Sequence, residues 1–201
     1  MDGGLASALI DATAAAIAAH AEELTRLDQA IGDGDHGANL HRGFQAIAAQ
    51  RDALAGLGLG AALQKAGMVL VTTVGGASGP LYGSLFMGMG KALQAGQGPS
   101  EAFAEGIESV KRRGKSDVGA KTMLDVLVPA LAALRAGGGR AAMLAELRRT
   151  AEASREATRP MQATRGRASF LGERSIGHVD PGAASSCLLI QAVCDVLEAW
   201  A

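Results

Sequence analysis

Apolar residues recur at helical spacing along almost the whole chain, and no segment alternates apolar and polar residues as a half-buried β-strand does. The chain is 48% hydrophobic but only 3% aromatic, so its core must be built mainly from Ala, Leu, Val and Met. Such small side chains suit helices that approach one another closely. The pattern predicts an all-α fold of eight helices without a sheet. The length of 201 residues predicts a single domain over residues 1–201.

The limits of the predicted helices come from glycines, prolines and capping residues. Ser100 is the expected N-cap of the fifth helix, and Asp180 is the expected N-cap of the last, with Pro181 in its first position. Residues 160–181 lack helical periodicity, and a loop of this length inside a domain is often functional. The eight predicted helices span residues 5–24, 38–54, 60–74, 81–94, 100–113, 124–134, 140–158 and 181–200.

Three carboxylates and several glycines are concentrated in residues 27–39, between the first two predicted helices. Asp28, Asp33 and Asp35 would repel one another in a partly dry pocket, and a hard divalent cation relieves such repulsion. Oxygen ligands alone favour Mg²⁺ over zinc. On a continuous helix, side chains five and two residues apart point to different sides. The three carboxylates therefore converge only if the helix ends near Asp28. The alternative is a solvated turn, in which Asp and Gly are common.

Two familiar loop motifs are excluded by their spacing. An EF-hand loop beginning at Asp33 would need Gly at its sixth position and Glu at its twelfth, where the sequence has Ala38 and Phe44. Residues 109–116 nearly match a phosphate-binding P-loop, but Ser109 replaces the first Gly, and a predicted helix rather than a strand precedes them. The sequence therefore predicts neither motif.

A second glycine-rich tract, residues 75–80, separates the third and fourth predicted helices. Its glycines permit close backbone approach to a ligand, and Ser78 offers a hydroxyl near the next helix N-terminus. Taken alone, the tract could equally be an ordinary turn between helices. The N-terminus of the second predicted helix, beside the acidic stretch, is a suitable position for a phosphate group.

The formal net charge of −1 argues against a nucleic-acid binder, which usually carries a strong basic excess. The charges are unevenly distributed, with 5 Lys/Arg against 11 Asp/Glu in residues 1–110 and 14 against 9 in residues 111–201. An acidic half that holds metal and a basic half that faces phosphate or an acidic partner would fit one nucleotide site between them. Most individual charges are nevertheless expected only to solvate helix faces.

The two cysteines, Cys187 and Cys194, are seven residues apart on one predicted helix. At 1.5 Å per residue they would be about 10.5 Å apart, which is too far for a disulfide. We expect them to be reduced core residues of a cytoplasmic protein. We expect no signal peptide and no membrane-spanning segment.

Four stretches of the chain carry long motifs, and together they span nearly the whole chain. The first is residues 27–43, around Gly32-Asp33-Gly34-Asp35-His36-Gly37, and the second is residues 75–83, around Gly76-Ala77-Ser78-Gly79. The other two are Gly119-Ala120-Lys121-Thr122-Met123-Leu124-Asp125 and residues 166–183, from Gly166-Arg167 to Asp180-Pro181-Gly182. In content and order these stretches resemble the nucleotide-binding L subunit of dihydroxyacetone kinases, and four long motifs together are far more specific than any one of them.

The resemblance implies an antiparallel bundle or barrel of eight helices with a nucleotide site at one end. It implies that Asp28, Asp33 and Asp35 hold two Mg²⁺ ions that bridge the phosphates of ADP or ATP. The residues implied in phosphate contacts are His36, Gly37, Ala38, Asn39, Ala77 and Ser78. Those implied to line the nucleotide are Gly114, Met123, Arg167, Asp180, Pro181 and Gly182. Met123 could instead be a core residue, and His36 or His178 could be a structural histidine.

By the same resemblance, the chain carries a phosphoryl group to dihydroxyacetone held on a separate K subunit. The implied donor is a phosphohistidine protein of the phosphotransferase system that rephosphorylates bound ADP, although exchangeable ATP is the donor in another branch of the family. The Ala-rich helical surface is compatible with a homodimer. Three alternatives stay open: an ATP-dependent kinase subunit for another small hydroxyketone, a non-enzymatic ADP-loaded regulatory module, and a helical scaffold with an acidic turn.

Overall fold

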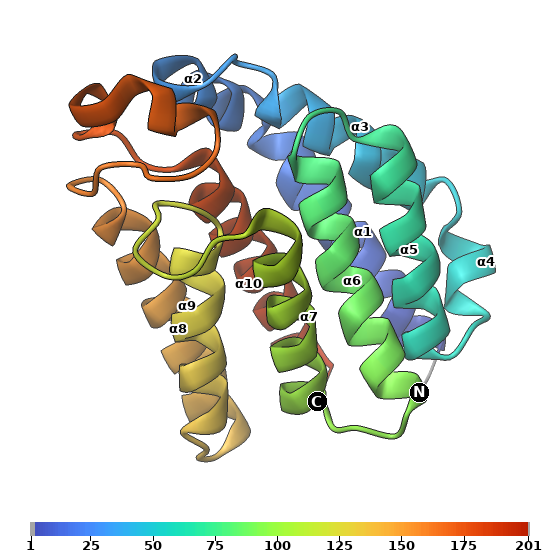
Figure 1. Cartoon of the computed structure of the whole chain (residues 1–201). Coiled ribbons are helices and arrows are strands. Elements are labelled where there is room, and N and C mark those ends of the chain that lie inside the picture. Colours follow the sequence, from blue (N-terminus) through green and yellow to red (C-terminus); the bar gives the residue numbers. More distant parts are fainter. Residues whose placement is uncertain (1–2, 201) are drawn as a thin grey trace.

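The computed structural model describes residues 3–200, which form ten α-helices and one 3₁₀-helix, η1, with no β-strand among them (Figure 1). The all-α prediction is confirmed. The elements are α1 (Gly3–Ala19), α2 (Ala21–Ile31), α3 (His36–Ala48), α4 (Arg51–Ala55), α5 (Leu59–Thr73), α6 (Ser78–Gln94), α7 (Pro99–Gly114), α8 (Leu124–Arg135), α9 (Arg140–Ala157), η1 (Arg167–Ser175) and α10 (Pro181–Ala199).

The predicted count of eight helices is wrong, because two predicted helices are each divided and one further helix is invisible in the sequence pattern. The first predicted helix bends by 56° between α1 and α2, and the second is divided into α3 and the short α4. The further helix is η1. Its interior residue Gly172 has a φ of 55°, which breaks the regular spacing that a sequence pattern detects.

The two capping predictions have different outcomes. Asp180 is the N-cap of α10, and Pro181 is its first residue, as predicted. Ser100 is not a cap, because α7 begins at Pro99 with Gly98 as its N-cap. Proline suits the first turn of a helix because it lacks the N–H that would have no intrahelical acceptor there.

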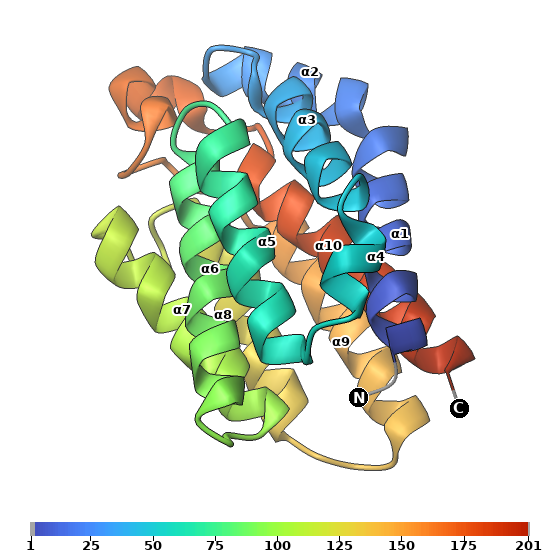
Figure 2. The same ribbon diagram turned by 90° about the vertical axis from the view of Figure 1, so that its right-hand side faces the viewer.

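Helix α10 packs between α1 and α9 and also contacts α2 and α8. Figure 2 shows α10 running between α1 and α9. Its residues Cys187 and Cys194 are free and buried, in agreement with the predicted reduced core cysteines. The largest fully buried apolar side chains of the core come from most of the helices; they include Ile17, Leu24, Leu40, Phe44, Leu54, Leu70, Tyr82, Ile107 and Leu124.

Glycines bring α5 and α6 into backbone contact. A Cβ atom on Gly67 would lie 2.8 Å from the carbonyl oxygen of Gly83, and a Cβ on Gly83 would lie equally close to the carbonyl oxygen of Gly67. Any larger residue at either position would push the two helices apart. The close approach therefore depends on the absence of side chains, in line with a core built from small residues.

Among the described residues, α10 is the one helix whose length and apolar composition would allow it to cross a membrane. Helices α1 and α2 meet the same criteria only when they are taken together across their bend. Half of the apolar stretch of α10 is buried within the fold, and core helices of globular proteins can be equally long and apolar. The finding is weak evidence for a membrane span.

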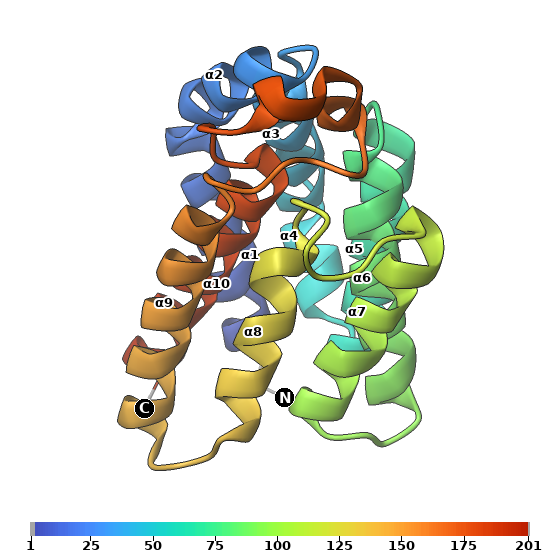
Figure 3. The same cartoon turned by 60° about the vertical axis from the view of Figure 1, so that its left-hand side comes forward.

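Several connections meet at one end of the molecule (Figure 3). They are the α2–α3 loop, the turn before α6, the loop between α7 and α8, and the long segment between α9 and α10. The N-termini of α3, α6 and α10 lie at the same end. The fold thus places polar loops and three helix N-termini around one cleft.

Candidate functional site

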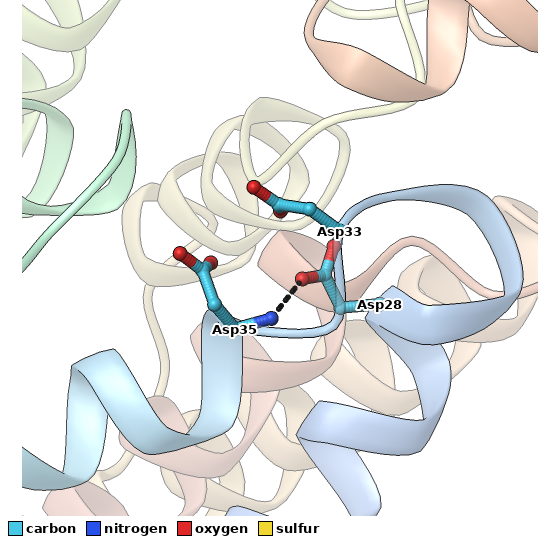
Figure 4. Close-up of side chains that lie close together, drawn as sticks. All are labelled: Asp28, Asp33 and Asp35. Carbon is cyan, nitrogen blue, oxygen red and sulfur yellow. Dashed lines mark hydrogen bonds between the residues drawn. The ribbon is translucent and has the colours of Figure 1, made fainter.

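The three predicted metal ligands lie together at this end of the fold (Figure 4). Asp28, Asp33 and Asp35 each offer one carboxylate oxygen, and these oxygens all lie within 4.8 Å of one another. Asp28 is buried, whereas the other two are exposed. Three convergent carboxylates without a Cys or His partner form a donor set that suits a hard cation such as Mg²⁺. The residues present therefore fit the predicted metal.

Local hydrogen bonds fix the position of the buried carboxylate. Asp28 is in the last turn of α2, and its Oδ2 accepts the backbone N–H of Asp35 at 2.9 Å and that of His36 at 3.1 Å. The C-cap of α2 must be Gly32, because a Cβ there would collide with the Asp28 carboxylate. The helix thus ends three residues after Asp28, and the loop folds back over its carboxylate.

Arg167 is the cation closest to this group among the ion pairs of the described residues. Its Nε lies 3.0 Å from Oδ2 of Asp33, and both side chains are partly open to solvent. Arg167 is the first residue of η1 and is distant in sequence from the acidic loop. The segment between α9 and α10 therefore brings a positive charge to the carboxylates.

His36 is buried behind the carboxylates, with both ring nitrogens in hydrogen bonds to hydroxyls. Nδ1 lies 2.9 Å from the Ser78 Oγ, and Nε2 lies 2.9 Å from the Ser185 Oγ. Burial lowers the pKa of His36, which the nearby Asp28 and Asp35 only partly oppose. The imidazole connects the N-terminus of α6 to α10. Both ring nitrogens of His36 are thus engaged within the protein, and the residue also lines the cleft.

The hydrogen-bond network continues from Ser185 to a buried tyrosine. The hydroxyl of Tyr82 lies 2.7 Å from the Ser185 Oγ and 2.9 Å from the Ser186 Oγ. Burial raises the pKa of Tyr82 to about 12, so the phenol stays neutral. Because Tyr82 lies on α6 and the two serines lie on α10, no local sequence pattern connects them, and sequence reasoning did not find this network.

Asp180 closes the opposite side of the cleft. Its Oδ2 accepts the backbone N–H of Ala183 at 2.8 Å. Burial raises the pKa of Asp180 to about 7, the negative charge of Asp125 adds to this effect, and the positive charge of Lys121 opposes it. Lys121 and Asp125 belong to one of the motifs found in the sequence, but no role was predicted for either.

A cleft of about 170 Å³ extends from the carboxylates. A second hollow of about 220 Å³ adjoins it and shares Ala77, Met123 and Gly166 with it. Gly114 lines only this second, mainly apolar hollow. The predicted site residues that line the first cleft are Asp28, Asp33, Asp35, His36, Ala77, Ser78, Met123, Arg167, Asp180, Pro181 and Gly182.

Three predicted phosphate contacts do not line the cleft. Gly37 is buried against α2, where a Cβ would overlap the carbonyl oxygen of Ala21. Ala38 is exposed and lines a different surface hollow beside α2. Asn39 is buried, and its Oδ1 accepts a hydrogen bond of 2.6 Å from Arg42. These residues form the first turn of α3, beside the carboxylates.

The chain is similar in sequence and in fold to known proteins. The DAK2 domain model matches residues 30–195. The ADP-binding subunit DhaL of the PEP-dependent dihydroxyacetone kinase of Escherichia coli is 43% identical over 179 residues, covering 85% of each chain. The ADP-binding subunit DhaL of the PTS-dependent dihydroxyacetone kinase of Lactococcus lactis is 41% identical over 174 residues, covering 87% of each chain.

Longer proteins match over a part of their length. The L-erythrulose 1-kinase of Mycolicibacterium smegmatis is 36% identical over 85% of this chain and 32% of its own. The crystal structure of the C. freundii dihydroxyacetone kinase in complex with AMP-PNP and Mg²⁺ superposes with a TM-score of 0.79 at 27% identity, covering 96% of this chain and 34% of that one. The present chain thus corresponds to about a third of these two proteins. From these matches, the chain belongs to the DAK2-domain family, alongside the ADP-binding L subunits of dihydroxyacetone kinases.

Proposed function

We propose that this chain is the ADP-binding, phosphoryl-carrying subunit of a dihydroxyacetone kinase that depends on the phosphotransferase system. The observation that carries the proposal is the convergence of Asp28, Asp33 and Asp35 at the mouth of a cleft that continues into an apolar hollow. A metal–diphosphate group requires the first feature, and a purine base suits the second. The similarity to the E. coli and L. lactis subunits supports the assignment to this kinase.

The three carboxylates would hold two Mg²⁺ ions, with Asp28 fixed in advance by its two backbone hydrogen bonds. When bound, the ions neutralise the phosphate oxygens and so stabilise the charge that develops during phosphoryl transfer. The C. freundii kinase, whose structure is a complex with AMP-PNP and Mg²⁺, supports magnesium as the metal. Phosphoryl transfer depends mainly on positioning and charge neutralisation, so the chain would contribute fixed metal ligands and no nucleophile.

The partial positive charges at the N-termini of α3, α6 and α10 would favour the phosphates. His36, Gly37, Ala38 and Asn39 form the first turn of α3, and Ala77 and Ser78 begin α6. Asp180, Pro181 and Gly182 begin α10. The base would lie in the second hollow, against Met123 and Gly114, while Arg167 faces the phosphates from η1.

In this function, bound ADP receives a phosphoryl group from a phosphohistidine donor protein and passes it to dihydroxyacetone held on a partner K subunit. The chain contributes positioning and charge neutralisation, which supply most of the catalysis in phosphoryl transfer. A homodimer and a cytoplasmic location stay predictions, and light scattering of the purified chain tests the first.

Calorimetry tests the nucleotide site. The purified chain is titrated with ADP in Mg²⁺ and in EDTA, after mass spectrometry has shown whether ADP is retained from expression. We expect Asp33→Asn with Asp35→Asn to lower the magnesium-dependent affinity for ADP at least about 100-fold. Asp117→Asn is the matched control, since Asp117 is exposed and pairs with Lys111 instead. Unchanged affinity and metal dependence in the double variant would contradict the proposal.

Reconstitution tests the reaction. Dihydroxyacetone phosphorylation is expected only when the chain is combined with a K subunit and a phosphohistidine donor, and turnover by the chain alone would exclude this division of labour. The similarity to L-erythrulose 1-kinase favours one second candidate, an ATP-dependent kinase subunit for another small hydroxyketone. Turnover with ATP and erythrulose but without the phosphohistidine donor would support that candidate. An ADP-loaded regulatory module would bind ADP and support neither reaction.

A further inference from the structure

Lys121 is buried at the base of the cleft although it carries a charge. Its side chain is only 1% exposed, and its backbone is left-handed, with a φ of 62°. The ammonium Nζ donates to three backbone carbonyls: those of Met161 at 2.9 Å, Ser175 at 2.6 Å and His178 at 2.7 Å. An ammonium has three N–H donors, so all of its hydrogen-bonding capacity is used within the protein.

Both the burial and the backbone conformation of Lys121 cost free energy. Burial of the charged ammonium is unfavourable, and the nearby carboxyl of Asp180 offsets this only from a distance, since none of the salt bridges of the described residues includes Lys121. A left-handed conformation is also unfavourable for a residue with a Cβ. Such costs are tolerated where the surrounding structure compensates for them, and here the compensation comes from three charge-assisted hydrogen bonds.

All three acceptors belong to residues 161–178, which we name the covering segment. Met161 is at its beginning, and Ser175 and His178 are at its end, so a single ammonium joins the two ends. Two further bonds act in the same sense: the Ala163 N–H donates to the Ser175 hydroxyl, and the Thr164 N–H donates to the carbonyl of Ala120. Hydrogen bonds therefore hold the two ends of the covering segment, residues 161–163 and 175–178, close together.

The middle of the covering segment lines the cleft. Arg165, Gly166, Arg167 and Ala168 are part of the cleft wall, and Arg167 reaches the carboxylate of Asp33. Within the described part of the chain, this is the one ion pair that the three clustered carboxylates form. The segment that carries the Arg167 guanidinium to Asp33 is thus the one whose two ends Lys121 joins.

The loop that carries Lys121 is itself fixed to α8. The buried carboxylate of Asp125 accepts the backbone N–H groups of Gly119 at 2.6 Å and of Thr122 at 2.7 Å. Lys121 therefore projects from a rigid support. A chain of hydrogen bonds leads from α8 through this loop and the Lys121 ammonium to the covering segment.

We propose that Lys121 is a positioning residue that anchors the covering segment, so that Arg167 is held over the metal and phosphate site. The functional part of this inference rests on the proposed nucleotide site, whereas the anchoring itself does not. Lys121 acts through Arg167 and does not bind phosphate, because its three donors are already engaged.

A double-mutant cycle tests the coupling between the two residues. Lys121→Gln keeps an N–H donor on a shorter side chain, and we expect it to weaken Mg·ADP binding about tenfold, as outer-shell substitutions commonly do. Arg167→Ala should then add little in the Lys121→Gln background. Additive losses would contradict the proposal, since they would mean that Lys121 acts independently of Arg167. Lys115→Gln is the control, because Lys115 is exposed in the same loop and also has a positive φ.

Limited trypsin digestion tests the anchoring without any nucleotide. Lys121→Gln should accelerate cleavage after Arg165, Arg167 and Arg174 about tenfold, because the covering segment opens more often, whereas Lys115→Gln should not. Unaltered cleavage in a folded Lys121→Gln protein would overturn the anchoring. The wild-type chain should be cut more slowly in the covering segment than after the exposed Lys115, and equal rates would contradict the proposal even if Lys121→Gln fails to fold. Absence of ADP binding by the wild type would contradict the proposed function but leave these digestion results valid.

Discussion

The guanidinium Nε of Arg167 lies 3.0 Å from Oδ2 of Asp33, so the covering segment places a cation against one of the three clustered carboxylates. A metal ion held by Asp33 would occupy the same electrostatic environment. Arg167 and such a metal would therefore compete for this carboxylate, and the oxygens of a bound phosphate would offer Arg167 another anionic partner. The pair connects the two halves of the sequence, of which the first is acidic and the second basic.

Arg167→Ala is expected to strengthen the binding of Mg²⁺ alone and to weaken Mg·ADP binding about tenfold, because loss of a charge-assisted arginine–phosphate contact of about 1.4 kcal/mol lowers affinity by that factor. The free energy of unfolding should change by less than about 0.5 kcal/mol, since Arg167 is exposed. Calorimetric titrations with Mg²⁺, and with ADP at saturating Mg²⁺, measure both effects. Arg174→Ala, an exposed arginine in the same η1 helix, is the control. Equal losses for the two variants would exclude a specific role for Arg167.

Gly37→Ala is expected to destabilise the fold by about 1–3 kcal/mol, because the added Cβ would overlap the carbonyl oxygen of Ala21 and force α2 away from α3. That movement would also separate Asp28 from Asp35 and reduce metal binding. Gly56→Ala serves as the comparison, since its Cβ would make only ordinary contacts, the nearest at 3.6 Å. Urea unfolding measures the difference. Similar stability in both variants would show that α2 and α3 tolerate separation.

Asp180→Asn is expected to alter how stability depends on pH. Asp180 has an ordinary pKa near 3.8 when unfolded and one of about 7 when folded, so the folded state binds the extra proton. The stability that this proton provides is complete below pH 3.8 and is lost as the pH rises to about 7. The wild type should therefore lose up to about 3 kcal/mol relative to Asp180→Asn between pH 5 and pH 8.

Urea unfolding of both proteins in EDTA, without nucleotide, measures this pH effect. The asparagine amide retains an oxygen that can accept the Ala183 N–H, so the N-cap of α10 is preserved. Parallel pH profiles for the two proteins would show that the carboxyl of Asp180 does not titrate in this range. A wild type that gains stability with rising pH, relative to the variant, would reverse the predicted sign.

The sequence predicted the helical class, the start of α10 at Pro181 and the residues of the acidic stretch. These features depend on local properties: apolar spacing, capping chemistry and the freedom of glycine. It failed for the division of the first helix at His20, and for η1, where Gly172 interrupts the periodicity. Whether a helix bends or continues depends on what it packs against, and that information is not local.

In the candidate site, too, some features follow from local sequence and others depend on packing. The closeness of Asp28, Asp33 and Asp35 follows from eight consecutive residues with glycines between them, so the sequence alone could indicate it. The contacts between distant residues could not be predicted from the sequence. Lys121 meets the covering segment, His36 meets Ser185, and Arg167 meets Asp33 only after the helices have packed.

The sequence by itself thus determined which groups are chemically able to hold a metal and a phosphate. Tertiary structure alone decided which of these groups face the cleft, and it turned the His36 side chain towards the hydroxyls of Ser78 and Ser185. The physical reason is that hydrogen-bond partners and charges separated by many residues meet only when the core forms, and the core fixes their distances.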